Sequence, residues 1–269
     1  MIHPTALVAP TAVLAPDVKA GPYAIIEEGV EIGPGCHIEA HGQVLSGVKM
    51  GARNTVGRGA VIGGNPQSLG FDISRASSVR IGDDNVFREH VTVHRSAVEG
   101  GETVIGSNNF LMAGCHLGHD TLLGDHNVLA NHVLVGGHVT IGSRCFLGGA
   151  AVFHQFIRIG DLAMVQGNSG FSKDIPPFCT GFRENRVEGL NVVGLRRAGF
   201  DGAARLDLKR AWAAVYQSML GLVRGAAAAL ESGHWTEASM KMLHFIANPG
   251  PKGVAGPVRD CRAVAKDEG

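Results

Sequence analysis

Apolar residues recur at every sixth position along most of this chain. The series runs over residues 2–62, resumes over 81–93 and continues over 105–165. Glycine follows about half of these apolar residues, and small residues usually stand four places after them. Six residues is the period of neither a helix nor a hairpin, but it suits a short strand followed by a tight turn. Because one such unit cannot bury its apolar side alone, the pattern predicts an all-β solenoid of stacked hexapeptide repeats.

Two segments interrupt this period, and we expect them to leave the solenoid wall as outward loops. They cover residues 68–80 and 97–104. Loops that leave a rigid scaffold frequently carry recognition residues. The solenoid itself is expected to cover residues 1–182, with both loops on its outside.

From residue 183 the six-residue period gives way to helical spacing. The expected helices cover residues 191–200, 203–225 and 237–247. Asp201 and Thr236 have side chains suited to capping the second and third of them. We therefore expect an α-helical cap over residues 183–250. Residues 251–269 combine proline, glycine and charge with little periodicity, which predicts a flexible tail.

Composition and charge exclude several classes of function. The 269 residues include 24 Lys+Arg and 24 Asp+Glu, so the chain lacks the basic surplus typical of nucleic-acid binding. We expect no membrane span, because no apolar run approaches about 18 residues, and no secretory leader, because no basic start precedes an apolar block. The five cysteines share no CxxC spacing and are expected to be reduced thiols in the cytoplasm.

Histidines are numerous and gather in the second half of the solenoid. The chain has 13, and the gathered ones are His116, His119, His126, His132, His138 and His154. None stands at an apolar position of the repeat, so their imidazoles are expected to point outward. An outward imidazole beside an acid, as His119 is beside Asp120, can be tuned near neutral pH. A general base, a metal centre and plain surface polarity are all open interpretations of this group.

Several strings together resemble one family over almost the whole length. They are IHPTALV (2–8), REHVTVHR (88–95), NNFLMAGCHLGHD (108–120), LANHVLVGGHV (129–139), AVFHQF (151–156), SKDIPPF (172–178) and GLNVVGLRRAGF (189–200). In these strings the chain resembles the acyl-[acyl-carrier-protein]–UDP-N-acetylglucosamine O-acyltransferases of lipid A biosynthesis. The resemblance implies a left-handed parallel β-helix with three hexads per coil, followed by the helical domain. It also implies a homotrimer with active sites in clefts between neighbouring solenoids.

The implied reaction moves a 3-hydroxyacyl chain from acyl carrier protein to the 3-hydroxyl of UDP-N-acetylglucosamine. In this resemblance His119 is the general base, Asp120 orients its imidazole, and the backbone N–H of Gly137 stabilises the oxyanion. A base with a pKa of about 6.5 suits a sugar hydroxyl, which is a poor nucleophile near neutral pH. A thioester needs no metal activation, so we expect no metal and no cofactor beyond the phosphopantetheine of the carrier protein.

The resemblance also assigns residues to substrate binding. They are Leu69, His116, His138, His154, Gln155, Asn191 and Arg197. Asn191 and Arg197 would hold the nucleotide end, where the fork of arginine suits a diphosphate. Gly167 would set the length of the acyl chain, although a plain turn glycine accounts for that position equally well.

The chain departs from the family pattern on the acceptor side and leaves other functions open. Ser68 and Gly70 flank Leu69 where relatives carry an acid and a lysine, Val193 stands where an acid is usual, and Ala198 replaces a basic residue. One alternative is a related hexapeptide acyl- or acetyltransferase that acts on a different UDP-sugar, such as an amino sugar, or uses a CoA donor. Another is a metal-binding relative such as the carbonic anhydrases of this repeat, disfavoured because the histidines fall on successive faces of the coil.

Overall fold

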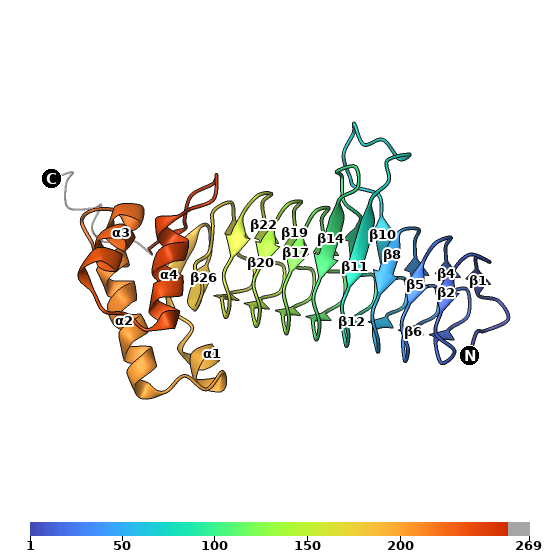
Figure 1. Cartoon of the computed structure of the whole chain (residues 1–269), viewed down its shortest axis with the longest axis horizontal. Helices are drawn as coiled ribbons and strands as arrows, with labels where there is room; N and C mark the ends of the chain where they lie inside the picture. Colours follow the sequence, from blue (N-terminus) through green and yellow to red (C-terminus); the bar gives the residue numbers. More distant parts are fainter. Residues whose placement is uncertain (258–269) are drawn as a thin grey trace.

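The computed structural model describes residues 1–257 and is a three-sided parallel β-helix with helices at its C-terminal end (Figure 1). Its strands, most of them two residues long, stack into sheets of nine, eight and eleven strands. Successive coils pair in register eighteen residues apart, as where Leu117 pairs with Val135 and Val135 with Phe153. These three side chains are buried inside the coil. The six-residue period is therefore confirmed as the period of burial.

The bounds of the strands follow from this winding. The nine-stranded sheet contains β1 (Leu7–Val8), β4 (Ile25–Ile26), β7 (Gln43–Val44), β10 (Val61–Gly64), β13 (Thr92–His94), β16 (His116–Leu117), β19 (Leu134–Val135), β22 (Val152–Phe153) and β25 (Gly170–Phe171). The eight-stranded sheet contains β2 (Val13–Leu14), β5 (Glu31–Ile32), β8 (Val48–Met50), β11 (Ser78–Ile81), β14 (Glu102–Ile105), β17 (Leu122–Leu123), β20 (Thr140–Ile141) and β23 (Arg158–Ile159). The eleven-stranded sheet contains β3 (Lys19–Ala20), β6 (His37–Ile38), β9 (Thr55–Val56), β12 (Val86–Phe87), β15 (Phe110–Leu111), β18 (Val128–Leu129), β21 (Phe146–Leu147), β24 (Met164–Val165), β26 (Cys179–Phe182), β27 (Arg186–Leu190) and β28 (Gly256–Pro257).

The turns between strands explain both the glycines and part of the histidine content. A Cβ on Gly118 would lie 2.7 Å from the carbonyl carbon of Gly136, so the glycine permits close approach of two coils. His126, His132 and His138 occupy a different turn position, with φ of 58 to 59°. Histidine is among the residues that tolerate this left-handed conformation better than most. Three of the gathered histidines thus stand where the backbone favours them, whatever their chemistry.

Two segments project from the corner at which the nine-stranded sheet leads into the eight-stranded sheet (Figure 1). They are residues 65–77, between β10 and β11, and residues 95–101, between β13 and β14. Both expected loops exist, but the first begins and ends three residues earlier than expected, and the second begins two and ends three residues earlier, because the first residues of β11 and β14 already belong to the wall.

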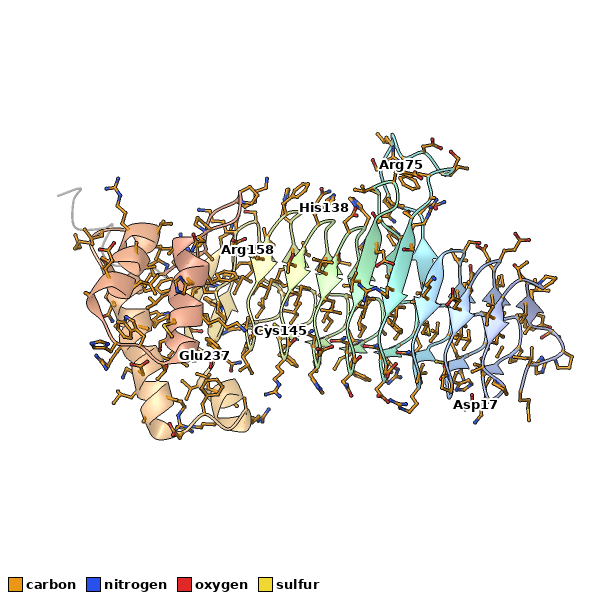
Figure 2. The ribbon with its side chains drawn as sticks, in the orientation of Figure 1. Asp17, Arg75, His138, Cys145, Arg158 and Glu237 are labelled. Atoms are coloured by element: carbon orange, nitrogen blue, oxygen red, sulfur yellow. The ribbon has the colours of Figure 1, made fainter. Side chains whose placement is uncertain are left out.

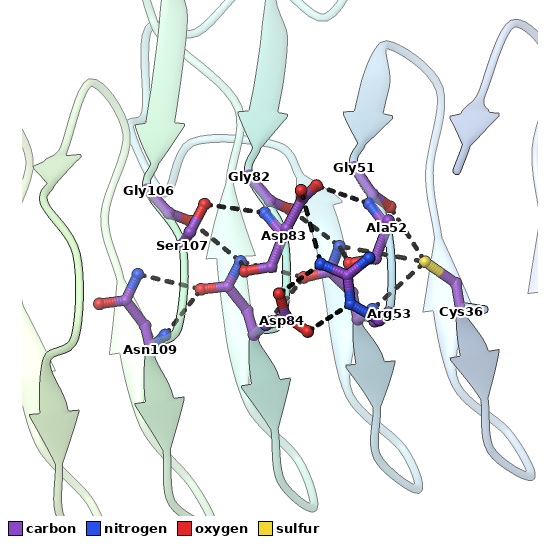
Figure 3. A network of polar contacts seen from close by, with 12 residues as sticks. Cys36, Gly51, Ala52, Arg53, Gly82, Asp83, Asp84, Gly106, Ser107 and Asn109 are labelled. Carbon is purple, nitrogen blue, oxygen red and sulfur yellow. Dashed lines mark hydrogen bonds and ion pairs between the residues drawn. The ribbon is translucent and has the colours of Figure 1, made fainter. Parts of the chain in front are cut away.

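A buried ladder of asparagines follows the corner at which the eight-stranded sheet leads into the eleven-stranded sheet, which we call the ladder corner. It consists of Asn54, Asn85, Asn109 and Asn127. The Oδ1 atom of Asn85 accepts from the backbone N–H of Asn109 at 3.0 Å and from its Nδ2 at 2.9 Å, and dashed lines at Asn109 in Figure 3 mark these bonds. The pattern repeats along the ladder. The ladder ties four coils together inside the solenoid.

A hairpin of β26 and β27 ends the coil before the helices begin. The helices are α1 (Val192–Arg197), α2 (Gly202–Tyr216), α3 (Leu222–Ser232) and α4 (Glu237–Ala247). Asp201 and Thr236 cap α2 and α4, as expected, by accepting from the N–H groups of Ala204 and Ser239. The single helix expected over residues 203–225 is wrong, since the chain breaks between α2 and α3 at Gly221, whose φ is 78°.

The expected tail is ordered in its first part. Strand β28 pairs with β27, and Val254 and Ala255 are buried. The prediction of flexibility is therefore wrong for residues 251–257, because they complete the hydrogen bonding of the hairpin. Residues 258–269 lie outside the described part of the chain.

An ion pair fastens the helical cap to the solenoid. Asp174 is fully buried, and its carboxylate lies 2.7 Å from the guanidinium of Arg158. Figure 2 labels Arg158 at the helical end of the solenoid. Arg158 also donates to the backbone oxygen of Asn248, and the N–H of Gly250 donates to Asp174. Within the described residues, no helix has the length and apolar character that crossing a bilayer requires.

Candidate active site

A cleft of about 830 Å³ lies along the outer face of the nine-stranded sheet, beside the corner from which the two loops project. We call this edge the histidine corner, because His94 ends a strand of that sheet there and His119, His138 and His154 follow other strands of it. Five of the predicted residues line the cleft: His116, His119, Gly137, His154 and Gln155. Gln67 reaches it from the first projecting segment.

A column of two histidines and two glycines forms the floor. His94, Gly118, Gly136 and His154 each follow the buried residue of a strand, in four successive coils. Coils stack at the spacing of paired strands, so the two histidines stand about 14 Å apart, with the glycines between them. The missing side chains of the glycines open the cleft between the histidines, and its lining continues past His154 to Ser172 and Arg183.

His119 and Asp120 form a hydrogen-bonded pair at the histidine corner. Nδ1 of His119 lies 2.7 Å from Oδ2 of Asp120, and both side chains are mostly buried. An ionised carboxylate only accepts hydrogen bonds, so Nδ1 carries the proton and Nε2 is left with a free lone pair. A Cβ built on Gly137 would lie 2.6 Å from that Nε2, so the free nitrogen faces this glycine. Among the described residues, the N–H of Gly137 has no hydrogen-bond acceptor.

The surroundings of Asp120 keep it ionised. Burial raises the pKa of its carboxyl group, but hydrogen bonds from Ser96, from His119 and from the N–H of Ala97 outweigh burial and lower the pKa below its usual value. The Ala97 N–H donates to Oδ2 at 3.0 Å, and the Ser96 hydroxyl donates to Oδ1. The carboxylate therefore stays charged at neutral pH and can stabilise an imidazolium at His119.

His138 lies behind this pair and not on the lining of the cleft. Its Nε2 is 3.5 Å from Oδ2 of Asp120, its ring meets that of His119 edge-on at 5.0 Å, and it stacks on Phe156 at 4.7 Å. The predicted role of His138 in the sugar pocket stays a prediction. Its contacts in the chain are with the histidine–aspartate pair.

Two further histidines lie at the other end of the cleft: His94, which is buried and was not predicted, and His116, which is half-buried. Burial, with the neighbouring His116, lowers the pKa of His94 to about 4, and burial likewise lowers the pKa of His116. Nδ1 of His116 lies 2.8 Å from the hydroxyl of Thr92, and its ring meets that of His94 edge-on at 4.6 Å. Both imidazoles are neutral at neutral pH. His94 shares the position of His154 in the repeat, which is the sequence signal that could have identified it.

Leu69 and Gly167, like His138, are predicted residues that do not line the cleft. Leu69 is fully exposed in the first projecting segment, where Gln67 and not Leu69 reaches the cleft. A Cβ on Gly167 would lie 2.9 Å from the backbone oxygen of Gly149, so packing between coils by itself requires a glycine there. Asn168, its neighbour, lines the cleft.

Asn191 and Arg197 line a second cavity, of about 750 Å³, on the outside of the eleven-stranded sheet. Arg144, Phe146 and His126 contribute to the same cavity. The side chain of Asn191 caps α1 by accepting from the N–H of Gly194 at 2.9 Å and donates to the backbone oxygen of Leu162. Within one chain, the residues predicted for the base and for the nucleotide end are therefore divided between two faces.

Ligand atoms of His119, Asp120 and His138 lie within 4.8 Å of one another, a spacing that a divalent cation could bridge. Both oxygens of Asp120 already accept hydrogen bonds, and Nδ1 of His119 shares its proton with one of them. These polar groups are satisfied without a cation. The arrangement fits an oriented general base better than a metal centre.

Comparison with known proteins places the chain in one family. A model described as UDP N-acetylglucosamine O-acyltransferase, domain 2, matches residues 174–255, and one described as bacterial transferase hexapeptide matches residues 102–137. An acyl-[acyl-carrier-protein]–UDP-N-acetylglucosamine O-acyltransferase of Xanthomonas euvesicatoria is 43% identical over 249 residues, which is 91% of this chain and 94% of the relative. The enzyme of the same description from Halorhodospira halophila is 43% identical over 223 residues, which is 82% of this chain and 86% of the relative.

Solved structures of UDP-N-acetylglucosamine acyltransferases are also similar to this chain. A UDP-N-acetylglucosamine acyltransferase from Campylobacter jejuni has a TM-score of 0.88 at 35% identity and covers 95% of this chain and 99% of its own. One from Bacteroides fragilis has a TM-score of 0.90 at 34% identity and covers 94% of this chain and 99% of its own. The fold is thus a left-handed parallel β-helix with a C-terminal helical domain. With this agreement over solenoid and helices alike, the chain belongs to the family of acyl-[acyl-carrier-protein]–UDP-N-acetylglucosamine O-acyltransferases.

Proposed function

We propose that this chain transfers a 3-hydroxyacyl group from the phosphopantetheine of acyl carrier protein to the 3-hydroxyl of UDP-N-acetylglucosamine, the first step of lipid A biosynthesis. The observation that carries the proposal is the His119–Asp120 pair, whose free Nε2 faces Gly137 in an open cleft. Membership of the family supports the identity of donor and acceptor. The buried, unpaired cysteines of the described chain suit a reducing compartment, and we assign the reaction to the cytoplasm.

His119, Asp120 and Gly137 account for the proton and the charge that the reaction moves. Nε2 of His119 takes the proton of the sugar hydroxyl as its oxygen attacks the carbonyl carbon of the thioester. The negative charge that develops on the carbonyl oxygen is stabilised by the N–H of Gly137. When the tetrahedral intermediate collapses, the C–S bond breaks and the leaving thiolate takes the proton back from His119. Asp120 holds the imidazole in one tautomer and stabilises its transient charge throughout.

We further propose that the active enzyme is a homotrimer in which one site uses two chains. Asn191 and Arg197 lie on a different face from His119, so a second copy would supply the nucleotide end of the site. Leu134 and Val152 beside the cleft, and Phe146 beside the second cavity, are each more than two-fifths exposed. Apolar side chains that line both faces are typical of surfaces that a partner covers.

Mixing two inactive variants tests the shared site. His119→Ala and Arg197→Ala chains would each be inactive alone, whereas trimers assembled from both would contain sites with both residues intact. We expect transfer activity to return when the two variants are unfolded and refolded together, and not when they are mixed already assembled. Activity that never returns, with trimers formed normally, would refute the shared site.

A different UDP-sugar is a second candidate for the acceptor. Val193 and Ala198 line the second cavity where family members typically carry charges, and no acidic residue lines it. A panel of UDP-sugars, each offered with 3-hydroxyacyl carrier proteins of several chain lengths, tests the acceptor and donor directly, with release of free carrier-protein thiol as the readout. We expect the highest kcat/KM with UDP-N-acetylglucosamine. Higher kcat/KM with an amino sugar would favour the second candidate, and Ser68→Asp with Gly70→Lys would then raise kcat/KM for UDP-N-acetylglucosamine.

A further inference from the structure

Ser96 is buried in the second projecting segment, next to the base, and has no role in the reaction described so far. It is completely inaccessible to solvent. Its hydroxyl oxygen accepts from the N–H of Val98 at 2.9 Å, and its single proton is donated to Oδ1 of Asp120. Because an ionised carboxylate has no proton to give, the direction of this hydrogen bond is fixed.

The two oxygens of Asp120 are divided between different donors. Oδ1 accepts from Ser96, whereas Oδ2 accepts from the N–H of Ala97 and from Nδ1 of His119. The terminal torsion of an aspartate is broad and nearly two-fold, so the side chain alone does not favour this orientation. Hydrogen-bond donors on both oxygens select this orientation of the carboxylate. Without the Ser96 hydroxyl, only the edge of the carboxylate nearest His119 would be held.

Ser96 is itself fixed by the first projecting segment. The hydroxyl of Ser77 donates to the backbone oxygen of Ser96 at 2.6 Å, and Arg75 donates to the backbone oxygen of Ala97 at 2.5 Å. Arg95 donates to Ser77 at 3.1 Å. Figure 2 shows Arg75 in the part of the chain that projects beyond the edge where His138 lies. Hydrogen bonds thus connect the loop that carries Gln67 with the carboxylate behind His119.

We propose that Ser96 is a positioning residue, whose hydroxyl holds the Asp120 carboxylate in the orientation that keeps the proton of His119 on Nδ1. Nε2 then stays free to take the proton of the acceptor hydroxyl. The inference rests on the proposed function, because it assigns Ser96 to the same base. Ser96 acts through Asp120 and does not touch the substrate.

The kinetic test compares Ser96→Ala with the parent enzyme. We expect kcat to fall about tenfold, the cost of one hydrogen bond to a charged group, while KM for UDP-N-acetylglucosamine stays within twofold. In an Asp120→Ala background the same substitution should have no further effect on kcat, since Ser96 has no other route to the base. Ser169→Ala is the matched control: it removes a buried hydroxyl that has no hydrogen-bond partner and should leave kcat unchanged.

A second measurement needs no catalysis. In protein labelled with ¹⁵N-histidine, the His119 signals, identified by their absence in His119→Asn, report which ring nitrogen carries the proton. The parent should show the proton on Nδ1, and Ser96→Ala should move the population toward the Nε2–H tautomer. Ser96→Cys keeps the shape with a weaker donor and should give an intermediate result, and it carries the test if the alanine variant does not fold.

Three results would overturn the inference. The first is a Ser96→Ala or Ser96→Cys variant with the kcat and the His119 tautomer of the parent. The second is a raised KM with kcat unchanged, and the third is an equal loss of kcat when Ser96→Ala is added to Asp120→Ala. A raised KM alone would show that Ser96 only stabilises the projecting loop. If the parent transfers nothing to any UDP-sugar, the proposed function fails, and the tautomer comparison still decides the role of Ser96.

Discussion

The ladder corner and the histidine corner are built from the same six-residue unit, yet their polar groups meet different partners. At the ladder corner each asparagine amide accepts from the next coil, and the column is closed to solvent. At the histidine corner two glycines replace side chains in the column, so a cleft opens; His119 and Gly137 line it, and within the described residues the N–H of Gly137 has no acceptor. Polar groups that satisfy one another hold the coils together, whereas polar groups left free toward a cleft can act on a substrate.

The largest expected effect falls at the histidine corner, on the free nitrogen itself. His119→Ala should lower kcat by about 10²–10⁴, the usual range for a removed general base. The side chain is mostly buried but borders the cleft and is not part of the apolar core, so the urea unfolding midpoint should stay close to that of the parent. Steady-state transfer assays and circular dichroism measure the two quantities. Near-normal turnover would show that His119 is not the base.

A substitution at the ladder corner should lower stability and leave catalysis unchanged. Asn109→Ala leaves the backbone N–H and the Nδ2 of Asn127 without an acceptor inside the solenoid and removes one of the two donors to Oδ1 of Asn85, which keeps the backbone N–H of residue 109. We expect a loss of about 3 kcal/mol in the free energy of unfolding, since each buried polar group without a partner costs 1–3 kcal/mol. At low temperature kcat should be unchanged, because the ladder and the cleft lie at different corners.

Urea unfolding and transfer assays on the same preparation check this separation of roles. Asn131→Ala, at an exposed asparagine of the solenoid, is the matched control and should alter neither quantity. A large fall in kcat for Asn109→Ala at full folding would contradict the comparison, since it would couple the two corners.

The contrast between the corners also explains what could be predicted from the sequence. The winding follows from a local signal, since every sixth residue is apolar, and the caps at Asp201 and Thr236 are equally local. His119 and Asp120 are neighbours in the chain, so their pairing needs no knowledge of the fold beyond an outward turn. The family strings then gave the pair its role.

The missed features all depend on contacts between coils. His94 matters because it shares a column with Gly118 and His154, and the projecting segments hide that register in the sequence. Ser96 meets Asp120 across 24 residues, whereas regular coils repeat after eighteen. The placement of Asn191 on a different face from His119 depends on where the hairpin and α1 turn back, which no period in the sequence encodes.

The smallest expected effect is on the pH dependence of stability and falls on His94. This residue stands at the histidine corner but is buried, as the asparagines of the ladder are. Its pKa of about 4 in the folded chain is below the value of about 6.5 expected on unfolding, chiefly because of burial. The unfolded chain therefore binds the proton more tightly, and the stability that the neutral imidazole retains at pH 7 is lost as the pH falls from about 6.5 toward about 4.

Between pH 7 and pH 5 this linkage should lower the free energy of unfolding by roughly 2 kcal/mol through His94. Urea unfolding at the two pH values measures the change, and His94→Gln, which cannot titrate, should show a change smaller by that amount. His154→Gln, at the exposed end of the same column, is the matched control and should retain the full pH dependence of the parent. If His94→Gln loses as much stability between pH 7 and pH 5 as the parent does, the imidazole of His94 takes up its proton in the folded chain as readily as in water. Burial at this corner would then differ from burial in the ladder.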